Sequence, residues 1–404
     1  MAKFDLIIVG GGLAGASLAV ALRSSPLKIA LIENQASRTG SRTSAQEWDS
    51  RIYAISPINQ QFLEHIGCWQ HLDQARLTPI AEMDIRGDQN GRLQFSAAEC
   101  GTPNLGWIVE SSLIANELWE TVKRQANVTL ITQDPPTNLR FQTHVAEIQL
   151  SSGQTHSAQL IVGADGRDSW VRSNSGLIEE DIPYPQSGLI ANFHTEHPHH
   201  QVAHQWFDKN GVLAYLPLPG NRISIVWSTP HLQAEALCKL AQENPASFCE
   251  RIADAGHHTL GQLELITPPA AFPLRLIKVP QTVAHRIALI GDAAHGIHPL
   301  SGHGINLGFQ DARVLADLLL SAPAWQDIGE HPWLQRYQRA RKEEVLLTQT
   351  TTDLLQRLFN TNLPHFPGLL ATVRNAGLNL TNALPPVKNL LVQYALGNRP
   401  AFFL

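Results

Sequence analysis

The hydrophobic pattern at the start of the chain predicts a strand, a helix and a second strand. An apolar run of strand length covers residues 4–9, a glycine-rich turn follows, and an alanine-rich helical stretch covers residues 16–22. A second apolar run covers residues 27–32 and ends at Glu33. This order of elements within roughly 30 residues is that of a βαβ unit. The rest of the chain is organised around it.

The following part of the chain mixes strand and helix patterns. Polar residues 34–50 are expected to form a surface loop. Two short runs that flank the glycine-containing turn at residues 87–91 predict a hairpin. The predicted helices are 58–66 and 112–124, and the predicted strands are 83–86, 92–95, 128–131, 146–150 and 160–163.

From about residue 180 the pattern changes to alternating strands without βαβ spacing, which predicts a mostly antiparallel sheet. The remainder returns to helices and one further strand. The predicted strands are 188–194, 202–207, 212–216 and 222–227, with an extended segment at 263–276 and a strand followed by a loop at 286–292. The predicted helices are 234–255 and 304–320, and residues 325–404 are predicted to be helical with proline breaks.

Together these elements predict an α/β protein. A Rossmann-like dinucleotide-binding domain is interleaved with a mostly antiparallel β-sheet domain, which we expect to bind the substrate, and a helical region ends the chain. The predicted boundaries are 1–80, 105–180 and 277–340 for the first domain, 81–104 and 181–276 for the second, and 341–404 for the helical region.

Composition narrows the class of protein. Of 404 residues, 43% are hydrophobic and 16% are charged, which favours a large folded core. A formal net charge of −5 gives no support for nucleic-acid binding. No apolar run reaches about 18 residues, so no membrane span is expected. The four cysteines are far apart, which fits buried thiols in a reducing, cytoplasmic environment.

Several histidines near residue 200 invite a metal-binding interpretation. They have no fixed ligand spacing and no cysteine partner, so a polar hairpin tip is favoured and no metal site is expected. These residues are His194, His197, His199, His200 and His204.

The glycine turn carries the first sign of chemistry. Gly10, Gly12 and Gly15 fit the G-x-G-x-x-G pattern, in which the glycines allow a tight turn, close approach to a pyrophosphate and close helix–strand packing. The following helix would direct free N–H groups and a positive dipole end at that pyrophosphate. Glu33 ends the second strand, where an acidic residue can hold a ribose hydroxyl. A bound dinucleotide is therefore predicted.

Two more strands end in a glycine and an aspartate. Asp165 and Gly166 follow the strand at 160–163, and Gly291 and Asp292 follow the later one. An aspartate there can accept hydrogen bonds from ribose hydroxyls, and glycine lets a ligand approach the backbone. Each pair alone is a common turn. Arg51 could meet a diphosphate, but the sequence alone favours a solvated arginine at a helix entrance.

Taken together, these motifs resemble those of FAD monooxygenases of the aromatic-hydroxylase type, where they occur in this order and at similar spacing. More narrowly, the chain is similar to the ubiquinone-biosynthesis hydroxylases, which act on polyprenyl phenols, and the similarity covers essentially the whole chain. The segments that carry it are the glycine motif with Glu33, residues 164–166 with Ser169 and Arg172, residues 291–295 with Pro299, and residues 49–51, 215–219, 298–308 and 377–379.

The resemblance implies which residues hold non-covalent FAD. The ADP half would be bound by Gly10, Gly12, Leu13, Ala14, Gly15 and Glu33, and the diphosphate also by Arg51. Asp165 and Gly166 would serve FAD and the passing nicotinamide cofactor, and Asp292 would hold the ribityl chain. The isoalloxazine would be lined by Pro299, Gly302, His303, Gly304, Ile305 and Asn306.

Two of the implied positions keep a second interpretation. The family usually has glutamine where this chain has His303, which either adds a titratable group beside the flavin or is a tolerated polar replacement. Tyr215 is a candidate for the substrate wall, but aromatic strand residues usually pack in a core, and that interpretation is at least as strong.

The resemblance also implies the reaction. NAD(P)H reduces FAD, O₂ adds to the reduced ring, and the flavin hydroperoxide gives one oxygen atom to an electron-rich phenol; the cofactor carries the chemistry. A single G-x-G-x-x-G fits transient NAD(P)H binding. Two alternatives stay open. One is another flavin oxidoreductase, such as a prenyl reductase or a soluble aromatic hydroxylase, and the other is a non-catalytic flavin-binding subunit of a biosynthetic complex.

A polyprenyl substrate partitions into membranes, whereas the sequence predicts no membrane-spanning segment in the protein. An apolar channel, a partner that extracts the substrate, or peripheral contact with the inner face of the membrane would each resolve this. Apolar stripes at 369–380 and 387–396 favour core packing over an association surface.

Overall fold

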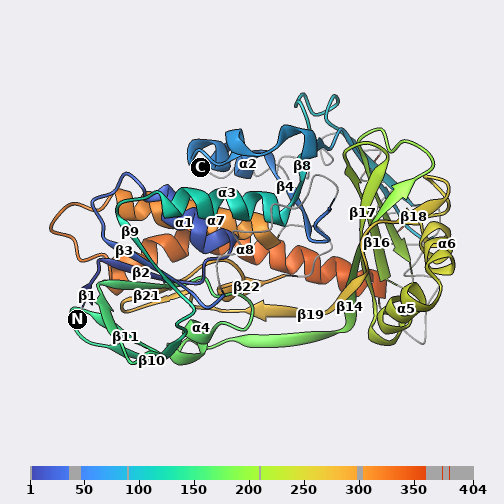
Figure 1. Ribbon diagram of the computed structural model, residues 1–404. Coiled ribbons are helices and arrows are strands. Elements are labelled where there is room, and N and C mark those ends of the chain that lie inside the picture. The colour runs from blue at the N-terminus through green and yellow to red at the C-terminus, as the bar shows by residue number, and fades with distance from the viewer. Residues whose placement is uncertain are drawn as a thin grey trace.

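The computed structural model describes residues 2–35, 47–88, 91–208, 211–297 and 304–360, together with 375 and 382. It has a helix-covered parallel sheet at one end and a large, mostly antiparallel sheet at the other (Figure 1). This is the interleaved α/β architecture that the sequence predicts.

The first part is a six-stranded sheet with the order β20-β21-β13-β2-β3-β9. All of its strand pairs are parallel except that of β20 with β21. The strands are β2 (Leu6–Val9), β3 (Ile29–Glu33), β9 (Val128–Thr132), β13 (Leu160–Gly163), β20 (Val283–Ala284) and β21 (Ile287–Leu289).

Both faces of this sheet are buried, which explains why its strands read as continuous apolar runs. Leu6 and Ile8 pack against helices on one face, and Ile7 and Val9 pack against a small sheet on the other. The covering helices are α1 (Leu13–Ala21), α3 (Ser111–Lys123) and α7 (Gly304–Leu320) (Figure 1). The small sheet, in the order β1-β12-β11-β10, contains β1 (Ala2–Lys3), β12 (Thr155–Ala158), β11 (Ala146–Leu150) and β10 (Pro136–Phe141).

The second part is a nine-stranded sheet, antiparallel except for the pairing of β15 with β6. Its strand order is β22-β19-β14-β17-β16-β15-β6-β7, with β18 paired to β14. The strands are β6 (Glu82–Arg86), β7 (Arg92–Ser96), β14 (Glu180–Thr195), β15 (Val202–Asp208), β16 (Gly211–Leu218), β17 (Arg222–Pro230), β18 (Leu263–Leu265), β19 (Ala270–Lys278) and β22 (His295–Gly296).

The two faces of the nine-stranded sheet have different neighbours. Helices α5 (His231–Glu243) and α6 (Pro245–Ala255) cover the outer face over a core that includes Phe193, Trp206 and Ile225 (Figure 1). The other face turns toward the first part of the molecule, where Leu218 packs with Ile52. Here it meets a three-stranded sheet of β4 (Ile52–Ile55), β8 (Trp107–Glu110) and β5 (Thr78–Pro79).

Two predicted segments are interrupted. The helix predicted at 234–255 is two helices, because Pro245 has no N–H for a continuous helix and the Asn244 side chain instead caps α6 by accepting from Ser247 N (3.1 Å). The extended segment predicted at 263–276 divides into β18 and β19, with two prolines at 268 and 269 between them.

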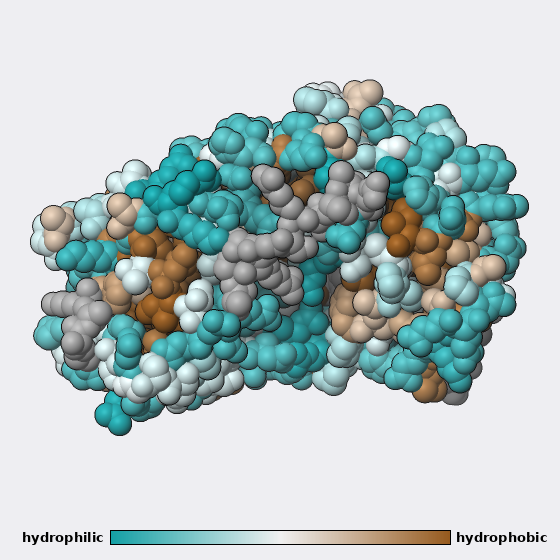
Figure 2. All heavy atoms as spheres, in the orientation of Figure 1, coloured by the Kyte–Doolittle hydropathy of each residue, from teal (hydrophilic) through white to brown (hydrophobic). Residues whose placement is uncertain are grey.

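The remaining helices are α2 (Pro57–His65), α4 (Trp170–Asn174) and α8 (His331–Asn360), with the short helices η1 (Trp69–His71), η2 (Gln74–Arg76) and η3 (Gly291–Ala293). Most of the helical prediction beyond residue 360 lies outside the described residues. In the described part of the chain, no helix has a stretch long and apolar enough to cross a bilayer. The face shown in Figure 2 is mainly hydrophilic, with hydrophobic residues gathered mostly toward the two ends of the molecule.

Candidate functional site

The strands that carry the three sequence motifs are neighbours in the parallel sheet. In the order β21, β13, β2 and β3, they lead to Gly291, Ala164, Gly10 and Glu33. Because the pairings are parallel, their carboxyl ends meet at one edge of the sheet. Ligands of open α/β sheets bind outside this edge.

The three glycines of the first motif have different surroundings. Gly10 has φ +104°, and a Cβ there would lie 2.3 Å from the carbonyl oxygen of Ala164. A Cβ at Gly15 would lie 2.0 Å from the carbonyl oxygen of Gly10. A Cβ at Gly12 would meet no atom within 4 Å. Packing therefore requires Gly10 and Gly15, whereas Gly12 borders open space.

That open space lies at the N-terminus of α1. Gly12 is its exposed N-cap residue, and neither a side-chain cap nor an acidic residue occupies the first turn. The first N–H groups of a helix have no partner within the helix, so this end suits an anion. Leu13 is buried and Ala14 packs against the third motif, where a Cβ on Gly291 would lie 3.1 Å from the Ala14 Cβ.

Glu33 is held beside the glycine turn by backbone donors. Gly11 N donates to its Oε2 (2.7 Å) and Gln35 N donates to its Oε1 (2.9 Å). Trp119 of α3 fixes the turn from the other side, because its Nε1 donates to the carbonyl oxygen of Gly11 (2.9 Å). Each carboxylate oxygen keeps a lone pair that can accept a hydrogen bond from a hydroxyl group. The sequence analysis did not identify Trp119, since nothing in the helix pattern distinguishes it from a core residue.

The second motif loop is fixed mainly by its own residues. Asp165 accepts from Ser169 Oγ at Oδ1 (2.5 Å) and from Val171 N at Oδ2 (3.0 Å), and burial raises the pKa of this carboxyl. Gly166 has φ +87° and no atom near a Cβ. Arg172 donates to the carbonyl oxygen of Ala293 (2.9 Å), which ties this loop to the third motif.

Arg51 and Asp292 come from different elements and both lie within electrostatic reach of Tyr53. Arg51 is an exposed residue that precedes β4, and Asp292 is an exposed residue of η3. Burial raises the pKa of the Tyr53 hydroxyl, the Arg51 charge lowers it and the Asp292 charge raises it. Both charges therefore act on the same hydroxyl, and both residues are exposed.

A buried charge network lies directly beneath the third motif. Asp311 of α7 is fully buried; its Oδ2 accepts from Gly291 N (2.9 Å) and from His295 Nε2 (2.6 Å), and its Oδ1 accepts from Arg341 Nε (2.7 Å). Burial alone would raise the pKa of Asp311, but the charges of His295 and Arg341 outweigh it and lower the pKa. The sequence analysis missed this network; the available signal was Asp311, a carboxylate in the middle of a mostly apolar helix.

The first turn of α7 is tied to β4 and α2. The Asn306 side chain accepts from Ser56 N (2.9 Å) and donates to the carbonyl oxygen of Ala54 (2.7 Å). Its contacts hold this turn in place. Gly304 and Ile305 begin the helix. Three further predicted flavin-loop residues, Pro299, Gly302 and His303, lie outside the described residues.

Tyr215 lies in the outer core of the nine-stranded sheet, so its prediction as a substrate wall is corrected in favour of core packing. Its hydroxyl donates to the carbonyl oxygen of Ile252 in α6 (2.6 Å), and its ring packs edge-on against Trp206. It is 1% exposed, and its side chain lies on the outer face of the sheet, away from the sheet edge where the three motifs meet.

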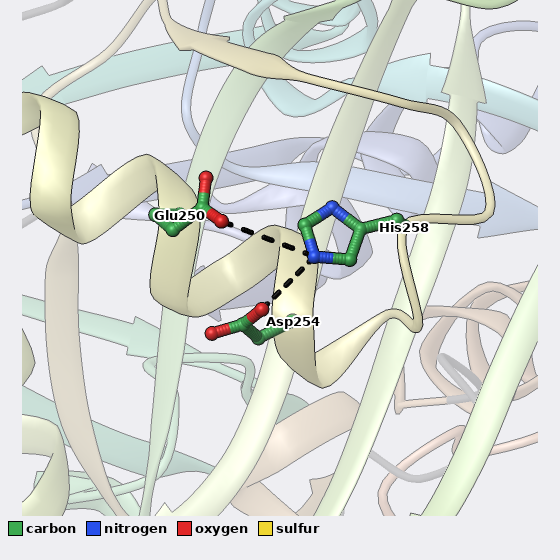
Figure 3. A group of neighbouring side chains, drawn as sticks. All are labelled: Glu250, Asp254 and His258. Atoms are coloured by element: carbon green, nitrogen blue, oxygen red, sulfur yellow. Dashed lines mark hydrogen bonds and ion pairs between the residues drawn. The ribbon is translucent and has the colours of Figure 1, made fainter.

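A group of exposed side chains lies on the far side of the molecule. Glu250, Asp254 and His258 come together at the end of α6 (Figure 3). His258 Nε2 lies 2.9 Å from Asp254 Oδ1 and 3.9 Å from Glu250 Oε1. A surface ion pair accounts for this arrangement.

Of the histidines near residue 200, His199 has its Nε2 within hydrogen-bond distance of the carbonyl oxygen of Leu218 (2.8 Å).

The arrangement fits FAD. Open space at Gly12, an uncapped helix N-terminus, the carboxylate of Glu33 and the exposed charges of Arg51 and Asp292 would serve the diphosphate, ribose and ribityl parts of the molecule. Among the described residues, no side chain lies near a Cβ at Gly12 or caps the N-terminus of α1.

Comparisons with known proteins agree with this fit. The FAD binding domain family model matches residues 3–346. Ubiquinone hydroxylase UbiL of Rhodospirillum rubrum is 34% identical over 397 residues, covering 97% of this chain and 89% of that protein. The 3-demethoxyubiquinol 3-hydroxylase of Escherichia coli is 31% identical over 396 residues, covering 97% of this chain and 98% of that protein.

Solved structures share the fold. p-Nitrophenol 4-monooxygenase PnpA from Pseudomonas putida superposes with a TM-score of 0.79 at 16% identity, covering 99% of this chain and 100% of that one. Klebsiella pneumoniae HpxO, complexed with FAD and uric acid, gives a TM-score of 0.74 at 15% identity, covering 98% and 97%. With the family model matching most of the sequence and relatives above 30% identity along nearly all of it, the chain belongs to the FAD-binding monooxygenase family, among the hydroxylases of ubiquinone biosynthesis.

Proposed function

We propose that this protein hydroxylates the aromatic ring of a polyprenyl phenol in ubiquinone biosynthesis, using FAD, NAD(P)H and O₂. The observation that carries the proposal is the meeting of three motif loops at one sheet edge in a chain that matches ubiquinone hydroxylases along its length. FAD supplies the ring that accepts hydride and activates O₂.

The chain's own residues would bind and orient the cofactor. We assign the diphosphate to the backbone around Gly12 and to Arg51, the adenosine ribose to Glu33 and the ribityl chain to Asp292. The support is the open space beside Gly12 and the exposed charges of Arg51 and Asp292, both within electrostatic reach of Tyr53. For the second motif we assign the backbone at Gly166 to the passing nicotinamide cofactor. The Asp165 carboxylate would shape that loop by accepting from Ser169 Oγ and Val171 N, and its remaining lone pairs could also serve the cofactor.

The start of α7 has a proposed electrostatic role. The helix begins at Gly304 and is held against β4 by Asn306. A helix N-terminus carries a partial positive charge, which stabilises a negative charge that lies close to it. This end would favour the anionic form of the reduced flavin, with Pro299 and residues 302–306 lining its ring.

The substrate domain is proposed to be residues 81–104 and 181–276, opposite the flavin domain made of residues 1–80, 105–180 and 277–340. Pockets commonly form between domains, and the inner face of the nine-stranded sheet is the surface that turns toward the flavin domain. Because the prenyl tail partitions into lipid, we propose peripheral contact with the inner face of the membrane during substrate transfer.

Quinone profiling in a strain that lacks the gene tests the function. The expected result is accumulation of a prenylated phenol that is one hydroxyl group short of the normal product, restored by the intact gene. An unchanged quinone pool would contradict the assignment. A change in prenyl saturation with ring hydroxylation intact would instead indicate a prenyl reductase.

A further inference from the structure

We propose that Asn192 and Ser224, on the inner face of the nine-stranded sheet, bind the hydroxyl group of the substrate's phenol ring, with the apolar substituent lying on the next row of the sheet. The inference rests on the proposed function and deepens it by assigning a substrate-binding pair.

The two residues lie side by side on the face that turns toward the flavin domain. Asn192 of β14 and Ser224 of β17 are direct partners in the antiparallel register, so their side chains point to the same face. Their odd-numbered neighbours Phe193 and Ile225 point the other way, into the core under α5 and α6. Leu216 of β16, the next partner of Ser224, packs with the three-stranded sheet that contains β4.

Both side chains are buried and keep an unused polar atom. Asn192 is 0% exposed and Ser224 is 1% exposed. Asn192 Nδ2 donates to the carbonyl oxygen of Asp49 (2.9 Å), but Asn192 Oδ1 and Ser224 Oγ have no hydrogen-bond partner in the part of the chain that the structure describes. Leaving a buried donor or acceptor unpaired costs about 1–3 kcal/mol, so a bound group that pairs both atoms would be stabilised here.

A phenol hydroxyl matches this pair. It can donate to an amide oxygen and accept from a serine hydroxyl at the same time. The pair also lies close to the proposed cofactor site, because Asn192 holds the backbone of Asp49, two residues before Arg51.

The neighbouring row of the sheet is apolar. Ile190, Val226 and Ala214 are consecutive partners across β14, β17 and β16, and each is only half-buried. They lie two residues along the strands from the polar pair, a separation of roughly 6.7 Å. A ring whose hydroxyl meets Asn192 and Ser224 would direct its apolar substituent over this row. In the opposite direction the same face carries the charged Arg222, which suits a polar end rather than a prenyl tail.

The test is the variant Ser224→Ala in the full-length, FAD-loaded protein, with Thr229→Val as the matched control. Thr229 is on the same strand and is 0% exposed, and its Oγ1 also has no partner among the described residues, but its side chain points to the opposite face. Measurements are thermal unfolding, FAD affinity, and steady-state hydroxylation of a short-chain prenyl phenol. Competitive inhibition by the O-methyl ether of the same phenol adds a readout that fold stability does not affect.

Ser224→Ala is expected to raise KM for the phenol about threefold to tenfold, with unchanged stability and FAD affinity, because one substrate hydrogen bond is lost. The methyl ether cannot donate to Asn192 Oδ1 but can still accept from Ser224 Oγ, so its inhibition constant should rise by a similar factor in Ser224→Ala. Thr229→Val should alter none of these. Equal KM values in the two variants, or a loss of stability in Ser224→Ala, would overturn the subsite. Failure of the wild-type protein to hydroxylate any prenyl phenol would instead overturn the proposed function.

Discussion

Replacing Asp311 by asparagine tests whether this carboxylate supports the FAD-binding loop at Gly291 in addition to stabilising the fold. The carboxylate accepts from Gly291 N, His295 Nε2 and Arg341 Nε, at 2.9, 2.6 and 2.7 Å. An asparagine keeps one oxygen and places an NH₂ group where the other was, so a donor faces a donor in either orientation. Breaking a buried ion pair from one side costs about 3–5 kcal/mol. We expect a loss of this size in the free energy of unfolding.

The informative result is the effect on FAD. Asp311 fixes the backbone at Gly291, and the next residue is the proposed ribityl ligand Asp292. We therefore expect the dissociation constant for FAD to rise about tenfold or more, equivalent to about 1.4 kcal/mol. The assay is titration of the apoprotein by quenching of flavin fluorescence, at a temperature where the variant is folded. His295→Ala, which removes one of the three contacts, should give a smaller change in the same direction.

The matched control is Asp327→Asn. Asp327 pairs with Arg286, whose side chain is 1% exposed, through contacts of 3.0 and 2.5 Å. Arg286 precedes β21, whereas Gly291 follows it, so the two networks lie at opposite ends of one strand. Asp327→Asn should lower stability and leave FAD affinity unchanged. If Asp311→Asn lowers stability but binds FAD as tightly as wild type, the argument that Asp311 supports the flavin loop is wrong.

Acid should weaken the same network. The pKa of Asp311 is lowered in the folded protein, because the charges of His295 and Arg341 outweigh the effect of burial; Tyr337 is the other titratable group that faces it. A lowered folded pKa stabilises the fold above the usual value of about 3.9, and this contribution is lost as the pH falls through the folded value. The difference in stability between wild type and Asp311→Asn should therefore close in acid. A difference that stays constant there would contradict this assignment.

Three further substitutions follow from the structure. Gly12→Ala should change stability by no more than about 1 kcal/mol, since a Cβ there meets no atom within 4 Å, yet it should weaken FAD binding measured by titration, because the methyl group enters the diphosphate space. Arg51→Met, at an exposed position, should leave thermal unfolding unchanged and make FAD affinity lower and less dependent on salt. Asn375→Ala removes contacts to Gly91 N (3.0 Å) and Asp88 Oδ1 (2.8 Å); a stability loss of about 1–3 kcal/mol with an unchanged oligomeric state, measured by light scattering, would favour core packing of the C-terminal segment.

Sequence patterns predicted the fold where one local signal dominated. The parallel strands are buried on both faces, so β13 reads as an uninterrupted apolar run and was predicted with the bounds that the structure shows. The helix at 304–320 was also predicted with its observed bounds. The break at Asn244 was missed because the apolar period continues through it, although Pro245 carried the signal.

The motif glycines and aspartates were identified in the sequence because each follows a strand directly. Their different roles depend on distant contacts that no local pattern contains. The positive φ of Gly10 and the packing of Ala164 against it distinguish that glycine from Gly12. Asp311 and Asn192 were missed for the same reason. Asp311 forms hydrogen bonds with residues from three other elements, and the place of Asn192 beside Ser224 depends on the register of two strands.

The most direct test of the account is oxygen incorporation by the purified, FAD-loaded protein. The protein is supplied with NADH or NADPH, a short-chain prenyl phenol and ¹⁸O₂, and the product is analysed by mass spectrometry. The account predicts a product that carries one additional oxygen, labelled with ¹⁸O, on the aromatic ring, formed only when FAD and the reductant are both present. Consumption of NAD(P)H without a hydroxylated product, or incorporation of oxygen from water, would contradict it.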